Sequence, residues 1–315
     1  MLSRRYLRIK IMQALYAFFQ GDSKDLPRGE KDMFRGIDTL FELYHLMILL
    51  LVEVRFNAER AIEDAKNKHL PTKDDLNPSF RLVENKMLLK LEKNKQLKQF
   101  CERKKLSWQN EGELTRKILN NIRGGQLYAD YMRSEDHSFR ADKEFVIAVY
   151  NEYICDYDML ENFVEEKSIF WVNDLDYVNS MVLKSLENMR ENDTDSITLM
   201  TLYKNEEEDS TFASELFHKT VLHDEENQKL IGDKTQNWEI ERIAMMDILL
   251  MKMAITELLY FETVPVKVTL NEYIEISKMF STPKSKIFIN GILDKIVVDF
   301  RSSGRMQKKG RGLME

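Results

Sequence analysis

Glycine and proline are scarce in this chain, whose 315 residues include 11 glycines and 5 prolines. A protein made of many strands needs many tight turns, and these two residues dominate turns. Their scarcity argues against a β-sheet protein, while abundant Leu, Lys, Glu and Met favour long helices. With 43% hydrophobic residues, the chain can bury one large core or two modest ones. We therefore predict an all-α protein.

Cysteine and long apolar runs are also scarce. The two cysteines, Cys101 and Cys155, form no Cys-x-x-Cys pair, which argues against a disulfide framework or a zinc site. The longest uncharged apolar run, Leu43–Val52, has ten residues, whereas a membrane span needs about 20. No signal-peptide cleavage pattern follows the basic N-terminus. These absences predict a cytoplasmic protein with no membrane partner.

The usual signatures of catalysis are missing. The chain has no Gly-rich phosphate loop, no Gly-x-Ser-x-Gly elbow and no His-Glu-x-x-His zinc motif. His218 and His223 are five positions apart, without the Glu that a zinc protease places beside its first His. We therefore predict no catalytic residue, no metal site and no cofactor, and the protein is not expected to be an enzyme.

Positive charge gathers at the two ends of the chain. The net charge is −6, yet residues 1–10 carry +4 and residues 301–315 carry +4, which leaves −14 for the remainder. Basic ends on an acidic body suit a polyanionic ligand. Two solvated termini are the alternative interpretation.

Apolar residues recur at three- and four-residue spacing along most of the chain, which predicts amphipathic helices. The expected helices are Ser3–Gln20, Leu40–Ala65, Ser79–Arg103, Gly112–Met132, a segment from Trp238 onward, Thr269–Phe280 and Lys284–Phe300. The first helix crowds its basic residues into two turns, which favours a binding face over an ordinary polar face. In the third helix glutamates alternate with lysines, which favours a solvated face over a second nucleic-acid surface.

Two segments 67 residues apart share one pattern of apolar and aromatic residues. Phe145, Val149, Tyr150, Ile154, Val164 and Trp171 correspond to Phe212, Leu216, Phe217, Val221, Ile231 and Trp238. Any two amphipathic helices agree partly by chance. The paired tryptophans follow loops of equal length and favour a duplicated helical hairpin.

Several motifs occur in a fixed order near the two ends. They read Trp238; Asp247-Ile-Leu-Leu-Met-Lys-Met-Ala-Ile-Thr-Glu257-Leu; Pro265-Val-Lys-Val; Asn271-Glu-Tyr-Ile-Glu275; Ile287-Phe-Ile-Asn-Gly-Ile-Leu-Asp-Lys295; and, in the first helix, Arg4-Arg5-x-x-Arg8 with Gln13-Ala-Leu-Tyr16. In this order they resemble the transcription antitermination factor NusB family over residues 1–20 and 210–300. Two residues depart from the family pattern. Lys252 stands where family members usually have Arg, and Lys284 stands where they often have an acid.

This resemblance implies a NusB-like helical bundle that binds a short single-stranded RNA element, boxA. Binding would occur jointly with NusE, the small ribosomal protein, within the RNA polymerase elongation complex. The expected RNA-binding residues are Arg4, Arg5, Arg8 and Lys10 of the first helix, with Lys284, Ser285 and Lys286 at the start of the last. That second group would use the N–H groups that a helix start leaves unpaired. Tyr16 and Phe288 are the expected partner contacts, with core packing as the alternative for both.

The family-like parts are separated by many more residues than compact members contain. We expect a first NusB-like helix in residues 1–21, a helical insertion in 22–136 and a hairpin, the possible duplicate, in 137–208. The NusB-like C-terminal core would occupy 209–300 and a basic tail 301–315. The alternative functions are a non-catalytic protein-interaction scaffold, or an accessory RNA-binding domain related to those of RNA methyltransferases. The cofactor loop and catalytic Cys motif of such a methyltransferase are absent.

Overall fold

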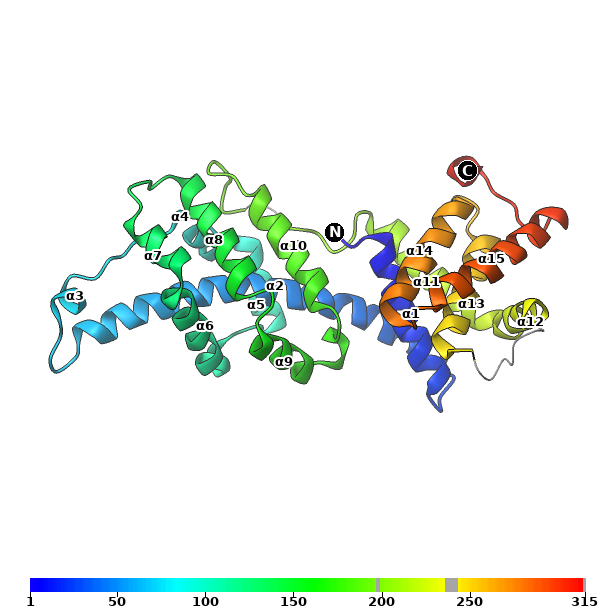
Figure 1. Ribbon diagram of the computed structural model, residues 1–315, viewed down its shortest axis with the longest axis horizontal. Helices are drawn as coiled ribbons and strands as arrows, with labels where there is room; N and C mark the ends of the chain where they lie inside the picture. Colours follow the sequence, from blue (N-terminus) through cyan, green and yellow to red (C-terminus); the bar gives the residue numbers. More distant parts are fainter. Residues whose placement is uncertain (197–198, 236–242, 314–315) are drawn as a thin grey trace. The chain divides into compact units, whose positions relative to one another are not determined.

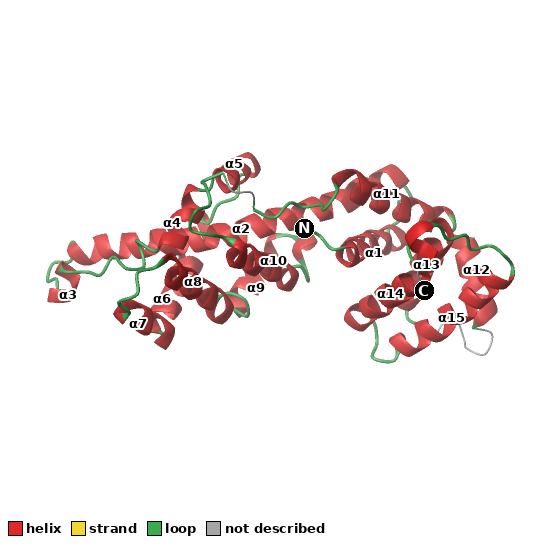
Figure 2. Ribbon diagram, turned by 90° about the horizontal axis from the view of Figure 1, so that it is seen from above, coloured by secondary structure: helices red, strands yellow, loops and turns green. Residues whose placement is uncertain are grey.

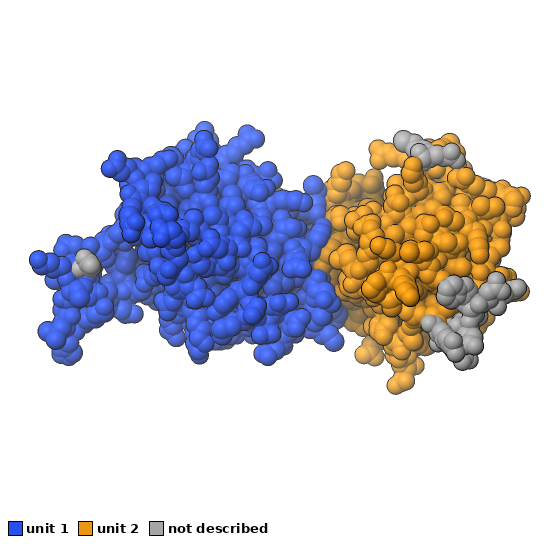
Figure 3. All heavy atoms as spheres, in the orientation of Figure 1, with its two compact units in different colours: residues 1, 38–202 blue, residues 2–37, 203–315 orange. Residues whose placement is uncertain are grey.

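The computed structural model describes residues 1–196, 199–235 and 243–313. Within these ranges the chain is helical without a strand (Figure 2), which confirms the predicted all-α class. It divides into two compact units, coloured separately in Figure 3: unit 1 is Met1 with Asp38–Leu202, and unit 2 is Leu2–Ile37 with Tyr203–Glu315. The helical insertion, 22–136, and the hairpin, 137–208, were expected to follow one another. Unit 1 starts later and ends earlier than these two segments together, and the expected border between them at residue 136 lies inside unit 1.

Unit 2 is a helical bundle built around one central helix. Its elements are α1 (Arg4–Gln20), the start of α2 (Leu26–Lys66), α11 (Glu206–Leu222), α12 (Asp224–Lys234), α13 (Met245–Tyr260), α14 (Val266–Phe280), α15 (Ser285–Ser302) and the 3-10 turn η4 (Gly310–Leu313). Helix α13 packs against α1, α11, α12, α14 and α15 (Figure 1). Leu250, Met251 and Ala254 on it are fully buried. Helix α13 is therefore apolar on more than one side.

The bounds of the family-like helices agree closely with the sequence pattern. Ser3 begins α1 by accepting a hydrogen bond from the Tyr6 amide at 3.2 Å, the usual role of serine at this position. Pro265 precedes α14 and lacks only an N–H that a helix start leaves unpaired. Helix α13 begins later than expected, at Met245, and Trp238 lies outside the described residues.

Unit 1 contains the rest of α2 and a succession of shorter helices. They are α3 (Lys73–Leu76), α4 (Lys86–Lys93), α5 (Lys95–Lys104), η1 (Gln109–Glu111), α6 (Gly112–Gly124), α7 (Gln126–Arg133), α8 (Phe139–Tyr153), α9 (Asp158–Lys167), η2 (Ile169–Trp171) and α10 (Leu175–Asn188). Two tryptophans attach them to α2: the Trp108 indole donates to the Leu46 carbonyl at 2.9 Å, and the Trp171 indole to the Thr39 carbonyl at 2.7 Å. Burying each indole with a partner avoids an unsatisfied donor.

Two of the expected long helices of unit 1 are each split in two. Asn94 ends α4, and its side chain accepts from the Leu97 amide at 2.8 Å to begin α5. Gly125, in an extended conformation, separates α6 from α7. A one-residue break barely disturbs the apolar periodicity, so the spacing rule predicted single helices at both places.

The helix bounds agree with the 67-residue repeat. Helices α8, α9 and α10 follow one another as α11, α12 and α13 do, and α8 and α11 begin at Phe139 and Glu206. Their N-caps, Ser138 and Asn205, are also 67 positions apart, and each side chain accepts a hydrogen bond from the first turn. The 67-residue spacing therefore holds for the helix starts and their N-caps as well as for the apolar pattern, and the duplicated hairpin stays a prediction.

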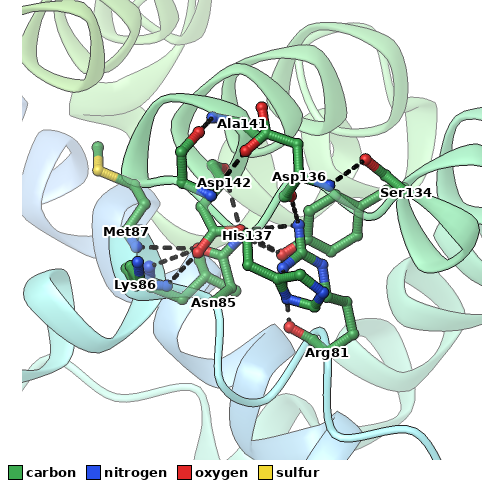
Figure 4. A network of polar contacts seen from close by, with 12 residues as sticks. Arg81, Asn85, Lys86, Met87, Ser134, Asp136, His137, Ala141 and Asp142 are labelled. Atoms are coloured by element: carbon green, nitrogen blue, oxygen red, sulfur yellow. Dashed lines mark hydrogen bonds and ion pairs between the residues drawn. The ribbon is translucent and has the colours of Figure 1, made fainter.

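A buried aspartate recurs in both copies. Asp142 and Asp209, again 67 positions apart, are 2% and 4% exposed. Asp142 lies 3.4 Å from the Arg81 guanidinium, in the network drawn in Figure 4, and Asp209 lies 2.7 Å from Arg4. Both arginines also lie over an aromatic ring: Arg81 over that of Tyr131, which precedes the first hairpin, and Arg4 over that of Phe212. The arginines come from outside the repeated segments, so the apolar pattern could not show this shared contact.

Candidate nucleic-acid interface

A groove of about 1540 Å³ opens on unit 2. Four segments line it: the start of α1, the start of α11, the turn between α13 and α14, and the C-terminal segment around η4. Its cations are Arg4, Arg5, Arg8, Lys204 and Arg311, its acids are Glu207, Glu208, Asp209, Glu215 and Glu272, and its apolar lining includes Phe212, Phe261 and Val264. The groove thus combines charges of both signs with an aromatic surface, which a nucleotide with its phosphate and base can use.

Arg4 lies at the rim of this groove with 40% of its side chain exposed. Its Nε lies 2.7 Å from Asp209 Oδ1, and its Cζ lies 4.4 Å from the centre of the Phe212 ring. The carboxylate and the ring hold the guanidinium in one orientation. The remaining exposed surface is accessible to a ligand.

Arg5 is held in a fork by Glu272 of α14. Its Nε and Nη2 each donate to a carboxylate oxygen at 2.9 Å. The hydrogen bonds to Glu272 raise the pKa of Arg5, so the guanidinium stays charged. With 42% of its side chain exposed, Arg5 presents an oriented cation at the surface.

Arg8 and Lys10 are not accessible in this structure. They are 2% and 3% exposed, and Arg8 donates to both carboxylate oxygens of Glu257 at 2.7 Å. A side chain enclosed in this way cannot reach a phosphate, so the expectation of direct RNA contact does not fit either residue. The signal was present in the sequence: Arg8 lies one helical turn before Met12, a core residue that is 1% exposed.

The start of α15 is built differently from the expected anion site. Ser285 is 1% exposed, and its hydroxyl donates to Asp247 Oδ2 at 2.8 Å. The amides of Ser285 and Ile287 donate to the Thr282 and Lys284 carbonyls, so these N–H groups are occupied. Ser285 therefore acts as an internal link between α13 and α15, and it does not present its hydroxyl to RNA.

Lys284 and Lys286 are exposed. Lys286 and Arg5 both act electrostatically on one carboxylate, that of Glu275. The pKa of Glu275 is lowered first by its hydrogen bond from Lys278 and further by the charges of Lys278, Arg5 and Lys286.

The two expected partner contacts differ in exposure. Tyr16 of α1 is 42% exposed, so its ring offers surface to another molecule. Phe288 of α15 is half-buried, and this exposure is compatible with either of its two expected roles, core packing and partner contact. Both assignments stay predictions.

Sequence reasoning missed two basic residues of the groove, Lys204 and Arg311. Lys204 stands immediately before the acidic start of α11, and Arg311 was counted in the basic tail, 301–315, without being named as a binding residue. The net charge of the last fifteen residues was a signal for Arg311, but the sequence does not show where that segment returns to the bundle.

The described part of the chain offers neither a metal-binding cluster nor a membrane span. Among its residues, no three His, Cys, Asp or Glu side chains gather where they could hold a metal ion. Within the described ranges, every helix is too short or too polar to cross a bilayer.

Residues 172–298 match the family model described as the NusB family. The relatives below are each named transcription antitermination protein NusB. The protein of Salinibacter ruber is 50% identical over 103 residues, which are 33% of this chain and 64% of the relative. The protein of Chloroherpeton thalassium is 40% identical over 104 residues, which are 33% of this chain and 49% of the relative. The protein of Geotalea daltonii is 42% identical over 86 residues, which are 27% of this chain and 59% of the relative.

The chain therefore spans about half to two thirds of the length of the curated relatives it matches. The remainder of the chain is additional sequence. No solved structure matches the chain significantly.

Proposed function

Residues 172–298 of this chain are a NusB-family domain, and from this premise we propose that the protein is an RNA-binding transcription antitermination factor. It would bind a boxA-like single-stranded RNA together with NusE in the RNA polymerase elongation complex, without catalysing a reaction. The observation that carries the proposal is the match of this domain to relatives named transcription antitermination protein NusB. The accessible basic residues beside its groove supply the chemistry.

The RNA backbone would follow the groove wall formed by α1 and continue over the start of α15, which lies outside the groove lining. Arg4, Arg5, Lys284 and Lys286 are at least partly exposed on these two segments. The opposite side begins α11 with Glu207 and three further acids in its first turn, which repel phosphates. Bases would face this acidic side, because carboxylates accept hydrogen bonds from amino groups of bases. Four phosphate contacts on single-stranded RNA predict a log–log salt slope of about −3.

NusE would join the complex through another part of α1. Tyr16 is exposed and lies about two helical turns beyond Arg8 in α1. A partner bound there could contact both the helix and the RNA. An aromatic side chain with an exposed hydroxyl is a common interface residue.

Binding of a labelled boxA-like RNA of about 12 nucleotides, with and without NusE, tests this function. The double variant Arg5→Ala and Lys286→Ala removes two exposed cations, so we expect weaker binding and a salt slope less steep by about 1.4. Arg28→Ala is the matched control, because Arg28 is an exposed arginine of unit 2 that belongs to neither α1 nor the start of α15. Arg8 is unsuitable as a test residue because its removal disturbs the core.

If the wild-type chain binds the RNA no better than a scrambled sequence, with NusE present or absent, the proposed function is wrong. If the double variant binds as tightly as Arg28→Ala, RNA binding stands but its assignment to this rim fails.

A further inference from the structure

The C-terminal segment returns to the bundle and is held there. The Lys309 amide donates to the Glu262 carbonyl at 3.0 Å, and its ammonium lies 2.8 Å from the Glu262 carboxylate. The Lys308 ammonium donates to the Phe261 carbonyl at 3.0 Å, at the C-terminal end of α13. A cation at this end satisfies carbonyls that the helix leaves unpaired and interacts favourably with its dipole. We call residues 305–313 the strap.

Glycine makes this close approach possible. Gly312 in η4 is buried, and a Cβ atom there would lie 2.0 Å from the Glu262 carbonyl oxygen. That oxygen belongs to the backbone, so no side-chain rotation can relieve the clash. Gly310 has a φ of 54°, a conformation that other residues rarely adopt. The strap is therefore shaped to seat against α13, although it begins after residue 298, where the family match ends.

The seated strap delivers Arg311 to the groove. Arg311 is exposed and lines the groove together with Arg4 and Arg5. Those two arginines are already paired with Asp209 and Glu272. Among the residues that the structure describes, Arg311 makes no ion pair. Its guanidinium is therefore uncompensated by any ion pair among the described residues, whereas Arg4 and Arg5 are each paired with one carboxylate.

We propose that the strap is a working part of the RNA site and that Arg311 is a phosphate contact, with exposed Lys204 on the far side of the groove. The inference rests on the proposed function and adds a binding residue that lies outside the family match. An uncompensated guanidinium binds a phosphate through two parallel hydrogen bonds. Because the strap is seated, this donor is held in position before RNA arrives, which reduces the ordering cost of binding.

The test measures binding of the full chain to the same labelled RNA for Arg311→Ala, Arg311→Lys, Gly312→Val and the control Arg28→Ala. We expect Arg311→Ala to weaken binding roughly tenfold and to make the salt slope less steep by about 0.7. Arg311→Lys should retain part of the affinity, since the charge remains but the fork is lost. Gly312→Val keeps every charge and unseats the strap, so it should weaken binding about as much as Arg311→Ala.

Four outcomes would overturn the proposal. If wild type binds but Arg311→Ala equals Arg28→Ala, Arg311 is no contact, and the proposed function stands. If Gly312→Val binds like wild type while Arg311→Ala is weak, the arginine acts from an unseated tail. If polyglutamate of equal charge binds as tightly as RNA with the same dependence on Arg311, the groove is a site for acidic peptides. If wild type does not bind RNA, the strap proposal and the proposed function both fail.

Discussion

Arg8 and Glu257 form a two-pronged ion pair in the core of unit 2. Nε and Nη2 of the arginine each lie 2.7 Å from a carboxylate oxygen, and the two side chains are 3% and 0% exposed. Thr269 donates to the same carboxylate at 2.7 Å and Tyr273 at 3.2 Å. Burial acts to lower the pKa of Arg8, but the charge and hydrogen bonds of Glu257 outweigh it and raise the pKa. Arg8 thus stays charged inside the bundle.

Removing one partner of this pair should strongly destabilise unit 2. Arg8→Met leaves the Glu257 carboxylate buried without its cation, and we expect a loss of about 3–5 kcal/mol in the free energy of unfolding. The double variant Arg8→Met and Glu257→Gln should recover most of this loss, because the buried charge is gone and Gln still accepts from Thr269. Urea unfolding followed by circular dichroism measures both. A single variant within about 0.5 kcal/mol of wild type would contradict the assignment.

His45 should make unit 1 sensitive to mild acid. The side chain is fully buried in α2, with its ring 3.8 Å from that of Phe100, and burial lowers its pKa from 6.5 to about 4. The folded state therefore holds the neutral ring while the unfolded chain takes up a proton. The contribution to stability is present above pH 6.5 and is lost as the pH falls towards 4, by up to about 3 kcal/mol.

Urea midpoints between pH 7 and pH 4 test this dependence. His45→Phe keeps an aromatic ring but cannot titrate, so its stability should fall less over this range. His69→Gln, at an exposed position, should keep the wild-type dependence. Equal slopes for wild type and His45→Phe would refute the role of His45.

The contact between the strap and the rest of unit 2 should become more stable as the pH rises. Burial lowers the pKa of Lys308 from 10.5 to about 8, although the charges of Glu257 and Glu262 act in the opposite direction. The seated state holds the proton less tightly than the unfolded chain, so stability rises as the pH passes from 8 towards 10.5 and stays at its lower level below 8. Relative to Lys308→Met, wild type should gain stability between pH 7.5 and 9.5. A constant difference across that range would contradict this expectation.

Both thiols should react slowly in the native protein. Burial raises the pKa of Cys101 to about 12 and that of Cys155 to about 11, so little reactive thiolate is present at neutral pH. Cys101 is buried and Cys155 half-buried, and we expect Cys155 to react first with a chromogenic disulfide at pH 8. Both should react fast after unfolding in urea. Rapid labelling of Cys101 in the folded chain would exclude this arrangement.

Part of the candidate site could be predicted from the sequence. Local signals placed the first helix correctly, because Ser3 caps it and its apolar residues repeat with the helical period. They also drew attention to Arg4 and Arg5, which the structure places beside the groove. The same cluster included Arg8, because the number of basic residues in a segment does not show which of them faces the core.

The helical class, the NusB-like motifs, the repeat and the concentration of positive charge at both ends could be read from the amino-acid sequence alone. These properties depend on the order of residues along the chain and on the periodicity of helices. Which cations are available depends instead on the folded structure. Arg8 meets Glu257, 249 positions away, and is neutralised in the core. Arg311 is carried to the groove by a strap that fits against Glu262 because Gly312 lacks a side chain. Burial and pairing across such distances depend on how the helices pack, and no local pattern records them.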